Sequence, residues 1–362
     1  MSGERDCQVF RDGFRSNFVE SHPEDCDCPT IVFVDDVVVS PRVIVLGMKS
    51  LTSSRNRWWR TLTVGAVLAV ALQGGIVAAT HADPAPATPY PVPNQFLIDA
   101  IRAALQGGAA SPPGTNDWAC RPSVQHPEPV VLVHGILANR NNNWQTYGPL
   151  LANGGYCVFA LTYNSPGGDP DGFIGGLGSM RDGAATLDTF IDRVRQVTGA
   201  GKVAIVGHSL GATMPYWYIK AGGGAGKVSR MVGLAGGVQG INSPGLSSGS
   251  ADAVAGEGLS SSTFMRELHE GGIAVPGVAY TQIVTRYDEV LPYTGGLIHE
   301  PGVANYIVQD LCSQDYADHL SINSDPVTAQ LVLNALDPEH PQPVECTLVL
   351  PAIGVLPTGS GG

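Results

Sequence analysis

The sequence predicts an α/β fold in which helices flank a mostly parallel sheet within a single domain. Short apolar runs recur between residues 130 and 311, and strands buried inside a parallel sheet have this pattern. Stretches with apolar residues at helical spacing separate the runs, and such alternation is typical of parallel strands joined by helices. At one strand-to-helix transition, residues 207–211, glycines lie on both sides of a serine. We see no internal repeat and no sign of a second domain.

The composition is that of a globular protein with long loops. Of the 362 residues, 43% are hydrophobic and 14% are charged, with 46 glycines and 27 prolines. This apolar content and low charge argue against a disordered chain. The formal net charge of −12 argues against nucleic acid as a partner, because nucleic acids select basic surfaces.

The segment before residue 83 predicts export. Residues 48–60 contain four basic residues and no acid, the apolar run 62–79 follows, and small residues lead to Ala82. This order is typical of a cleaved signal peptide, which we place at residues 48–82. The alternative is an uncleaved membrane anchor, but the run is shorter than the ~20 apolar residues of a spanning helix. We therefore expect secretion after cleavage near Ala82.

Residues 1–47 precede this signal, although a signal peptide begins at the N-terminus of a chain. Met48, followed by Lys49, would be a natural start. We therefore interpret residues 1–47 as a non-native extension that comes from a mis-assigned start.

The remaining chain divides into a lead-in and the α/β domain. Residues 83–118 combine a Pro-rich stretch, 83–93, with a short helix, 96–105, that ends at two glycines. The α/β domain is expected over residues 119–362. Its expected strands are 130–133, 157–161, 203–206, 228–234, 278–285 and 304–311. Its expected helices are 147–151, 179–197, a helix that follows strand 203–206 at once and runs through Tyr218, and 326–336.

Four cysteines follow the signal: Cys120, Cys157, Cys312 and Cys346. An even number in an exported chain fits two disulfides, and four cysteines allow three pairings. The sequence does not choose among them, but Cys120–Cys157 with Cys312–Cys346 closes the shortest loops, and we favour this pairing.

The strongest motif is Gly207-His208-Ser209-Leu210-Gly211, which has the pattern G-x-S-x-G. A strand enters this pentapeptide and a helix leaves it, so the turn between them must be very tight. Gly207 and Gly211 remove the side chains that would collide with the flanking strand and helix. The turn would hold the Ser209 hydroxyl at the carboxyl end of the sheet, near a helix N-terminus that favours negative charge. The alternative is an incidental Gly-Ser turn.

From about Val130 to Cys346 the chain resembles the secreted bacterial triacylglycerol lipases of the α/β-hydrolase superfamily. The resemblance rests on three segments in the same order: residues 131–136 (VLVHGI), residues 207–211 (GHSLG) and residues 285–290 (TRYDEV). It implies an α/β-hydrolase fold, with Ser209 as the nucleophile of a Ser-His-Asp triad. No cofactor and no metal are implied.

Asp288 is the expected acid of the triad. The superfamily's chain order is serine, acid, histidine, and Asp288 follows the apolar run 279–284. Glu289 is adjacent but would point the other way if the strand pattern continued. The alternative for Asp288 is a surface turn residue.

His319 is the expected base. Three histidines follow Asp288 in the sequence. His299 lies only eleven residues later, beside a Glu-Pro-Gly turn, and His340 lies in a Pro-rich tail. His319 follows the last expected strand, in a loop from which it could reach the serine. The alternative is a solvent-facing loop histidine.

An oxyanion hole needs two backbone N–H groups directed at the charge that develops on the substrate. The geometry of the turn suggests Leu210 as one donor, and the resemblance implies Ile136 as the other. We expect His134 to brace the loop before Ile136. His208, whose backbone directs it away, is not expected to be the base.

The resemblance implies a secreted serine ester hydrolase, in the first place a triacylglycerol lipase. A carboxylesterase or an acyltransferase would use the same triad, and a binding protein without activity could keep the same scaffold. The expected partner is an ester or lipid substrate, and the resemblance allows a transient contact with a lipid interface. Two Gly-rich loops, 164–178 and 236–262, could cover the acyl pocket or be plain surface. The oligomeric state is not predicted.

Overall fold

The computed structural model describes residues 89–241 and 253–356. The proposed extension 1–47 and the proposed signal peptide 48–82 lie outside the described residues. Within the described part, no helix combines the length and the apolar character needed to cross a membrane.

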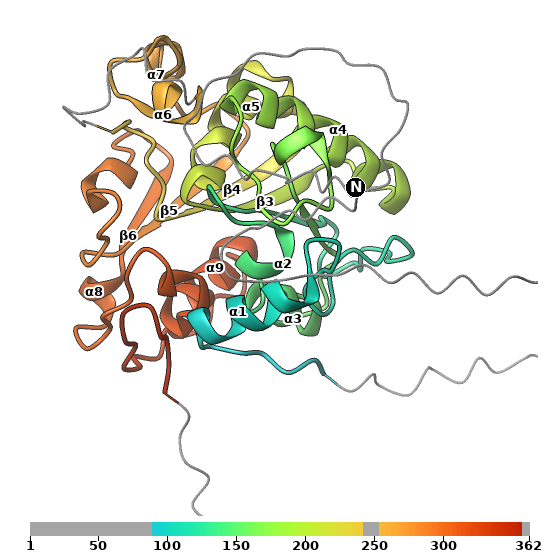
Figure 1. The fold of residues 1–362 in the computed structure, drawn as a ribbon, viewed down its shortest axis with the longest axis vertical. Helices are drawn as coiled ribbons and strands as arrows, with labels where there is room; N and C mark the ends of the chain where they lie inside the picture. The colour runs from blue at the N-terminus through green and yellow to red at the C-terminus, as the bar shows by residue number, and fades with distance from the viewer. Residues whose placement is uncertain (1–88, 242–252, 357–362) are drawn as a thin grey trace, which may run out of the picture. The chain divides into compact units, whose positions relative to one another are not determined.

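The core of the fold is a six-stranded sheet in which every neighbouring pair is parallel (Figure 1). The strand order is β2-β1-β3-β4-β5-β6, so β3 lies inside the sheet, between β1 and β4. The carboxyl ends of parallel strands meet at one edge, and the loops that follow β1, β3 and β5 are therefore neighbours. The strands are β1 (Val130–Val133), β2 (Val158–Leu161), β3 (Val203–His208), β4 (Val228–Leu234), β5 (Ala279–Val284) and β6 (Val303–Ile307).

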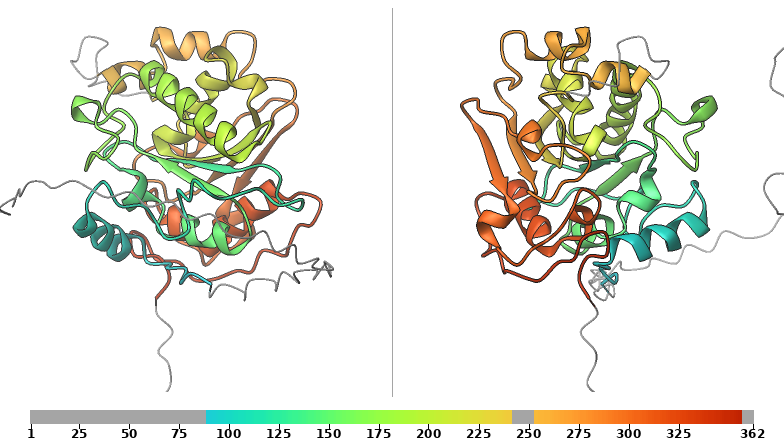
Figure 2. Two further views of the ribbon diagram at one scale, coloured as in Figure 1. Left: turned by 90° about the vertical axis from the view of Figure 1, so that its right-hand side faces the viewer. Right: turned by 60° about the vertical axis from the view of Figure 1, so that its left-hand side comes forward.

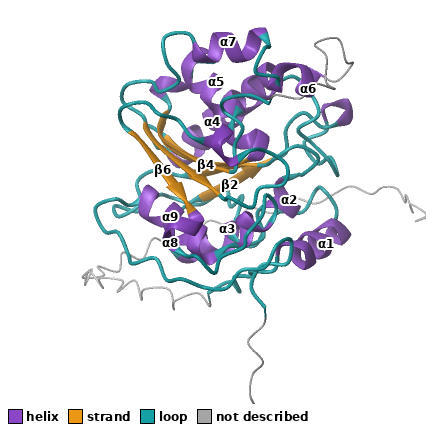
Figure 3. Ribbon diagram, turned by 90° about the vertical axis from the view of Figure 1, so that its left-hand side faces the viewer, coloured by secondary structure: helices purple, strands orange, loops and turns teal. Residues whose placement is uncertain are grey.

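Helices cover both faces of this sheet (Figure 3). Helices α4, α5 and α7 lie over one face, and α3 and α9 lie over the other (Figures 2 and 3). Alternate residues of a strand point to opposite faces, so Val131 and Val133 join one core and Val130 and Leu132 join the other. The helices are α1 (Phe96–Gln106), α2 (Arg140–Asn143), α3 (Tyr147–Asn153), α4 (Met180–Thr198), α5 (Met214–Ala221), α6 (Ala253–Gly258), α7 (Thr263–His269), α8 (Val308–Leu311) and α9 (Pro326–Leu336).

The expected helix after β3 is broken in the structure. A short 3-10 turn, Ser209–Ala212, follows the strand, and α5 begins only at Met214. Pro215 explains the break, because proline lacks an N–H group and is tolerated only in the first turn of a helix. The sequence correctly placed a helical segment here but missed this interruption.

The expected strand 304–311 is too long at its end. β6 stops at Ile307, and residues 308–311 form the helical turn α8. The last ladder pair joins Val284 of β5 to Ile307. β6 lies at the edge of the sheet, and β5, which is its neighbour in the sheet, ends at Val284. Residues 308–311 therefore have no strand to pair with.

The segment 236–262, expected as one long loop, is partly helical. Helix α6 occupies residues 253–258, and α7 follows it. Ser262 begins α7, and its hydroxyl accepts a hydrogen bond from the Met265 N–H at 3.0 Å. Residues 242–252 lie outside the described part.

The two ends of the described chain meet beside α1. The Leu97 N–H donates to the Ala352 carbonyl at 3.2 Å, and the Val355 N–H donates to the Asn94 carbonyl at 2.8 Å. Helix α1 therefore lies against the C-terminal segment, on the side of the sheet that also carries α9 (Figure 2).

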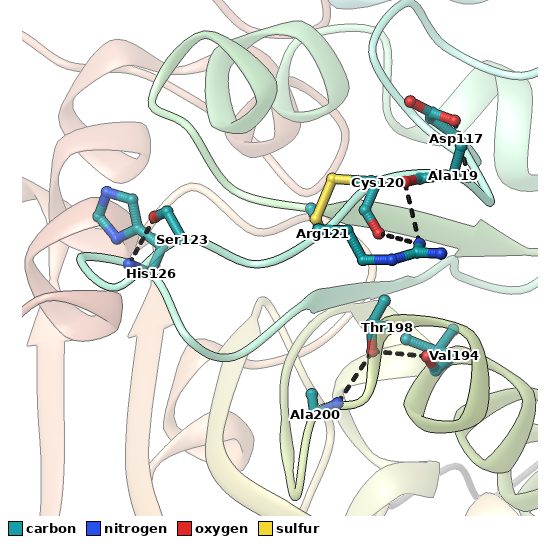
Figure 4. The surroundings of a disulfide bond; sticks show 10 residues. Asp117, Ala119, Cys120, Arg121, Ser123, His126, Val194, Thr198 and Ala200 are labelled. Carbon is teal, nitrogen blue, oxygen red and sulfur yellow. Dashed lines mark hydrogen bonds between the residues drawn. A yellow bond between two sulfur atoms is a disulfide. The ribbon is translucent and has the colours of Figure 1, made fainter. Parts of the chain in front are cut away.

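Both favoured disulfide pairings are present. Cys120 joins Cys157 at the start of β2, and Cys312 joins Cys346 in the C-terminal segment. Figure 4 shows the first bond beside Arg121, whose guanidinium donates to the carbonyls of Ala119 and Cys120. The second bond holds the C-terminal segment to the loop that leads to His319.

Candidate active site

The turn that carries Ser209 is held by close backbone packing. Ser209 has a positive φ of 54°, which is uncommon for a residue other than glycine. A Cβ atom at Gly207 would lie 1.8 Å from the Gly211 carbonyl oxygen, and one at Gly211 would lie 2.1 Å from the Val133 oxygen. Only glycine fits at either position, and this packing presents Ser209 at the carboxyl edge of the sheet.

The structure brings the three expected side chains into a single hydrogen-bonded line. The Ser209 Oγ lies 2.9 Å from His319 Nε2, and His319 Nδ1 lies 2.8 Å from Asp288 Oδ2. Ser209 and His319 are buried. The other two histidines after Asp288 lie apart from this line, since His340 contacts Asp337 and His299 is exposed.

The Asp288 carboxylate is fixed by its own loop. Its second oxygen accepts hydrogen bonds from the Val290 and Leu291 N–H groups, at 3.0 and 2.7 Å. The carboxylate therefore keeps one oxygen for the loop and one for His319.

The loop that carries His319 is held on both sides of the histidine. The His319 N–H donates to Glu289 Oε2 at 3.1 Å, and the His319 carbonyl lies 2.9 Å from His208 Nε2. Asp318 stabilises the turn that follows, because its carboxylate accepts from the Ser321 N–H at 2.8 Å and from the Ala352 N–H at 2.7 Å.

Two further histidines near the site are buried. Burial lowers the pKa of His134 to about 4, opposed by its hydrogen bond to the Gly135 carbonyl. Burial, followed by the charge of His319, lowers the pKa of His208 to about 3. Both rings are therefore neutral near pH 7. His134 stacks on Tyr163, contacts the Gly135 carbonyl in its own loop through Nδ1, and accepts from the Tyr163 N–H through Nε2, as expected of a brace.

Ile136 and Leu210 are the residues whose N–H groups are expected to form the oxyanion hole. Both residues line a cavity that also contains Ser209. The loop of Ile136 is held by the Leu137 N–H, which donates to the Gly175 carbonyl at 2.9 Å. Gly175 belongs to the loop 164–178, which thus braces the loop of Ile136. Among the described residues, no member of the loop 164–178 lines either cavity at Ser209.

Two cavities meet at Ser209. One, of about 190 Å³, is walled by apolar side chains that include Met180 of α4 and Met265 of α7, together with residues of the segment 236–262. The other, of about 350 Å³, is lined by His319, Leu320 and residues of α1. Ser209 and Ile136 border both cavities.

The sequence missed three contributions to the site. Glu289 does not continue a strand pattern, because β5 ends at Val284, and its carboxylate reaches the His319 backbone. His208 contacts the same backbone from the other side, and α1 walls the larger cavity. For Glu289 and His208, the only signal in the sequence was that they adjoin Asp288 and Ser209. For α1, the sequence held no signal of a role at the site.

A parallel sheet with a serine on a tight turn after an inner strand, facing a histidine and a carboxylate, defines an α/β-hydrolase. A family model, described as lipase (class 2), matches residues 127–332, which is more than half of the chain. The chain therefore belongs to this lipase family.

A solved lipase structure shares this fold. Aspergillus fumigatus lipase B is 17% identical, with a TM-score of 0.50 over 66% of this chain and 57% of that one. This chain thus matches little more than half the length of that lipase. Bacillus licheniformis lipase BlEst2 in its mature form is 14% identical, with a TM-score of 0.44 over 64% of this chain and 98% of that one.

Proposed function

We propose that this protein is a secreted serine hydrolase that cleaves acylglycerols through an acyl-enzyme, with Ser209, His319 and Asp288 as its triad. One observation carries the proposal: the Ser209 Oγ, His319 and Asp288 lie in a line with contacts of 2.9 and 2.8 Å. A nucleophile, a base and a group that orients the base need this geometry.

Each group has a definite task in this reaction. His319 Nε2 accepts the Ser209 proton as Oγ attacks the ester carbonyl, and later gives a proton to the departing alkoxide. Asp288 accepts from the Nδ1–H group, which keeps the lone pair of Nε2 directed at Ser209 and stabilises the imidazolium. Water then attacks the acyl-enzyme. His319 Nε2 accepts a proton from this water and gives a proton back to the Ser209 Oγ as the carboxylic acid departs.

The negative charge on the substrate oxygen needs fixed donors. The N–H groups of Leu210 and Ile136 are proposed for this role, each worth about 3–4 kcal/mol of the barrier. The position of both residues at the cavity with Ser209 supports the assignment.

The two cavities divide the substrate between them. The leaving oxygen takes its proton from His319, so the alcohol part lies in the cavity that His319 lines. The acyl chain then enters the apolar cavity walled by Met180 and Met265. A cavity of roughly 150 Å³ holds a benzene molecule. The 190 Å³ here therefore encloses roughly six to eight acyl carbons on the same scale, and longer chains extend outward.

Exposed apolar side chains around the openings favour a lipase over an esterase for soluble substrates. At the mouth of the larger cavity, Leu137 and Val290 are 60% and 55% exposed. Helix α1, which walls this cavity, buries Asp99 and Ala103 and turns apolar residues outward. These outward residues are Leu97, Ile98, Ile101 and Leu105. Single exposed apolar residues are ordinary, but a group beside a substrate cavity is typical of a surface that contacts lipid.

Secretion is part of the proposal. The basic and apolar segment 48–82 supports a cleaved signal peptide, with Met48 as the start. Two disulfides are usual in exported proteins and rare in the cytosol. N-terminal sequencing of the exported protein tests this part, and a mature N-terminus upstream of Met48 would overturn it.

A fluorophosphonate probe tests the class of protein. We expect it to label the protein at Ser209 and to leave the Ser209→Ala variant unlabelled. Absence of label on the wild-type protein would favour a binding protein without activity.

Hydrolysis of p-nitrophenyl esters from acetate to palmitate, beside a triglyceride emulsion, tests the substrate. We expect a maximum near six to eight carbons and activity on the emulsion. Activity confined to short soluble esters would identify a carboxylesterase. Products in which an added alcohol replaces water would identify an acyltransferase.

Substitutions in α1 test the lipid contact. The pair Ile101→Glu and Leu105→Glu should lower activity on the emulsion and preserve activity on a soluble ester. Val124→Glu is the matched control, because Val124 is 95% exposed and precedes β1, at the opposite edge of the sheet from Ser209. Equal loss on both substrates would contradict the lipid contact.

A further inference from the structure

The backbone of His319 is bound by the sequence neighbours of the two other triad residues. Glu289 follows Asp288, and its carboxylate accepts the His319 N–H at 3.1 Å. His208 precedes Ser209, and its Nε2 lies 2.9 Å from the His319 carbonyl oxygen. These two contacts involve the peptide groups on either side of the histidine.

We propose that Glu289 and His208 are positioning residues that hold the His319 backbone in register with Ser209 and Asp288. The inference rests on the proposed function, because it assigns His319 as the base. Neither residue is proposed to touch the substrate or to exchange a proton with it.

The direction of the His208 contact follows from its surroundings. The ring is buried and neutral, so it carries one N–H group. The His319 carbonyl can only accept, and therefore Nε2–H donates to it. The other ring nitrogen then carries no proton, so its 3.2 Å approach to Asn143 Oδ1 of α2 is a packing contact and not a hydrogen bond.

The Glu289 contact needs the carboxylate as an acceptor. The side chain is exposed, so its removal leaves no cavity in the core. The His319 loop has no regular structure between Cys312 and the 3-10 turn Ser321–Ser324. No helix or strand hydrogen bond therefore orients the His319 N–H, and the Glu289 carboxylate is the acceptor that does so.

Holding both peptide groups leaves His319 only its two side-chain torsions. Asp288 and Ser209 then set those torsions through the contacts at Nδ1 and Nε2. A catalytic group displaced by 1 Å can cost about 100-fold in rate. The backbone contacts therefore affect kcat, and loss of the Glu289 side chain, which lines neither cavity, should leave substrate binding unchanged.

The test compares alanine with conservative variants. We expect Glu289→Ala to lower kcat for a soluble ester by about 10- to 100-fold at unchanged KM. His208 borders the larger cavity, so His208→Ala is compared with the wild-type protein by kcat alone, and a similar fall in kcat is expected. Glu289→Gln keeps an acceptor and His208→Gln keeps a donor near the position of Nε2, so each should recover most of the loss. The rescue also separates positioning from a general loss of folding.

Glu300→Ala is the matched control. The Glu300 carboxylate also binds backbone, accepting from the Ile273 and Ala274 N–H groups at 2.7 and 2.9 Å. It precedes β6 and therefore lies at the amino edge of the sheet, away from Ser209. We expect unchanged kcat and KM in this variant.

A spectroscopic readout separates this inference from the proposed function. The proton between His319 Nδ1 and Asp288 should give a low-field NMR resonance in the wild-type protein, and that resonance should broaden or vanish in Glu289→Ala and His208→Ala. This result would support the positioning role even if no ester were hydrolysed. An unchanged resonance, unchanged kcat in both alanine variants, or a Glu289→Gln variant as slow as Glu289→Ala would overturn it.

Discussion

The nucleophile and the acid–base pair are built in different ways. Ser209 lies on a turn that two glycines within five residues make possible, Gly207 through its approach to Gly211 and Gly211 through its approach to Val133 of β1. Asp288 and His319 lie on two loops that are fixed by contacts from distant parts of the sequence. The first region is specified by local sequence and the second by tertiary structure. Substitutions should therefore fail for different reasons in the two regions.

The largest effect is expected for Ser209→Ala, which removes the nucleophile and leaves the turn intact. We expect kcat to fall by about 10⁵- to 10⁶-fold. The melting temperature should stay near that of the wild-type protein, because the Oγ bonds only to His319 among the described residues. Residual activity within a factor of about ten of wild type would show that another residue is the nucleophile.

Asp288→Asn should be the next most severe change, with a fall in kcat of about 10⁴-fold. An asparagine can still accept from the Val290 and Leu291 N–H groups, so the loop should keep its shape. Its amide N–H₂ faces His319 Nδ1 and selects the wrong tautomer. The kinetics of Asp288→Asn and Glu289→Gln should be compared; equal losses would contradict separate roles for the two carboxylates.

Gly211→Ala should damage stability, because the new Cβ atom would lie 2.1 Å from the Val133 carbonyl oxygen. We expect a loss of about 3–5 kcal/mol, which lowers the melting temperature by about 10 °C. Gly201→Ala is the control, since nothing lies within 4 Å of a Cβ atom there. Calorimetry that gives both variants the same melting temperature would show that the turn tolerates a side chain.

The smallest effect concerns a carboxyl pair in the His319 loop. Burial, then the charge of Asp325, raises the pKa of Asp315 to about 8. The folded protein thus keeps a proton that the unfolded chain releases above its ordinary pKa of 3.8. The free energy of unfolding that Asp315 contributes therefore decreases as the pH rises from about 3.8 to about 8. Above pH 8 this contribution no longer changes with pH.

Asp315→Asn removes this dependence. An asparagine still accepts from the Ala317 N–H, the present partner of Asp315 Oδ1 at 2.8 Å. We expect a melting temperature about 2–4 °C above wild type at pH 8 and a smaller difference at pH 4. A lower melting temperature than wild type at pH 8 would contradict a buried proton at this position.

Sequence reasoning was strong where local chemistry decides the structure. Short apolar runs identified every strand of the sheet, and the two glycines identified the turn at Ser209. The chain order of the superfamily selected Asp288 and His319, which the structure brings together. The features that sequence reasoning misjudged depend on contacts with distant residues. Strand β6 ends where its partner β5 ends, and the Glu289 side chain turns toward the loop of His319, thirty residues away.

The fastening of the C-terminal segment has a consequence for biosynthesis. Ala352 binds the turn after His319, Val355 binds the chain just before α1, and Cys346 holds Cys312. A nascent polypeptide lacks these contacts until residues 346–355 have been synthesised and have left the ribosome. We therefore expect the loop that carries His319 to reach its final geometry only after that part of the chain is in place.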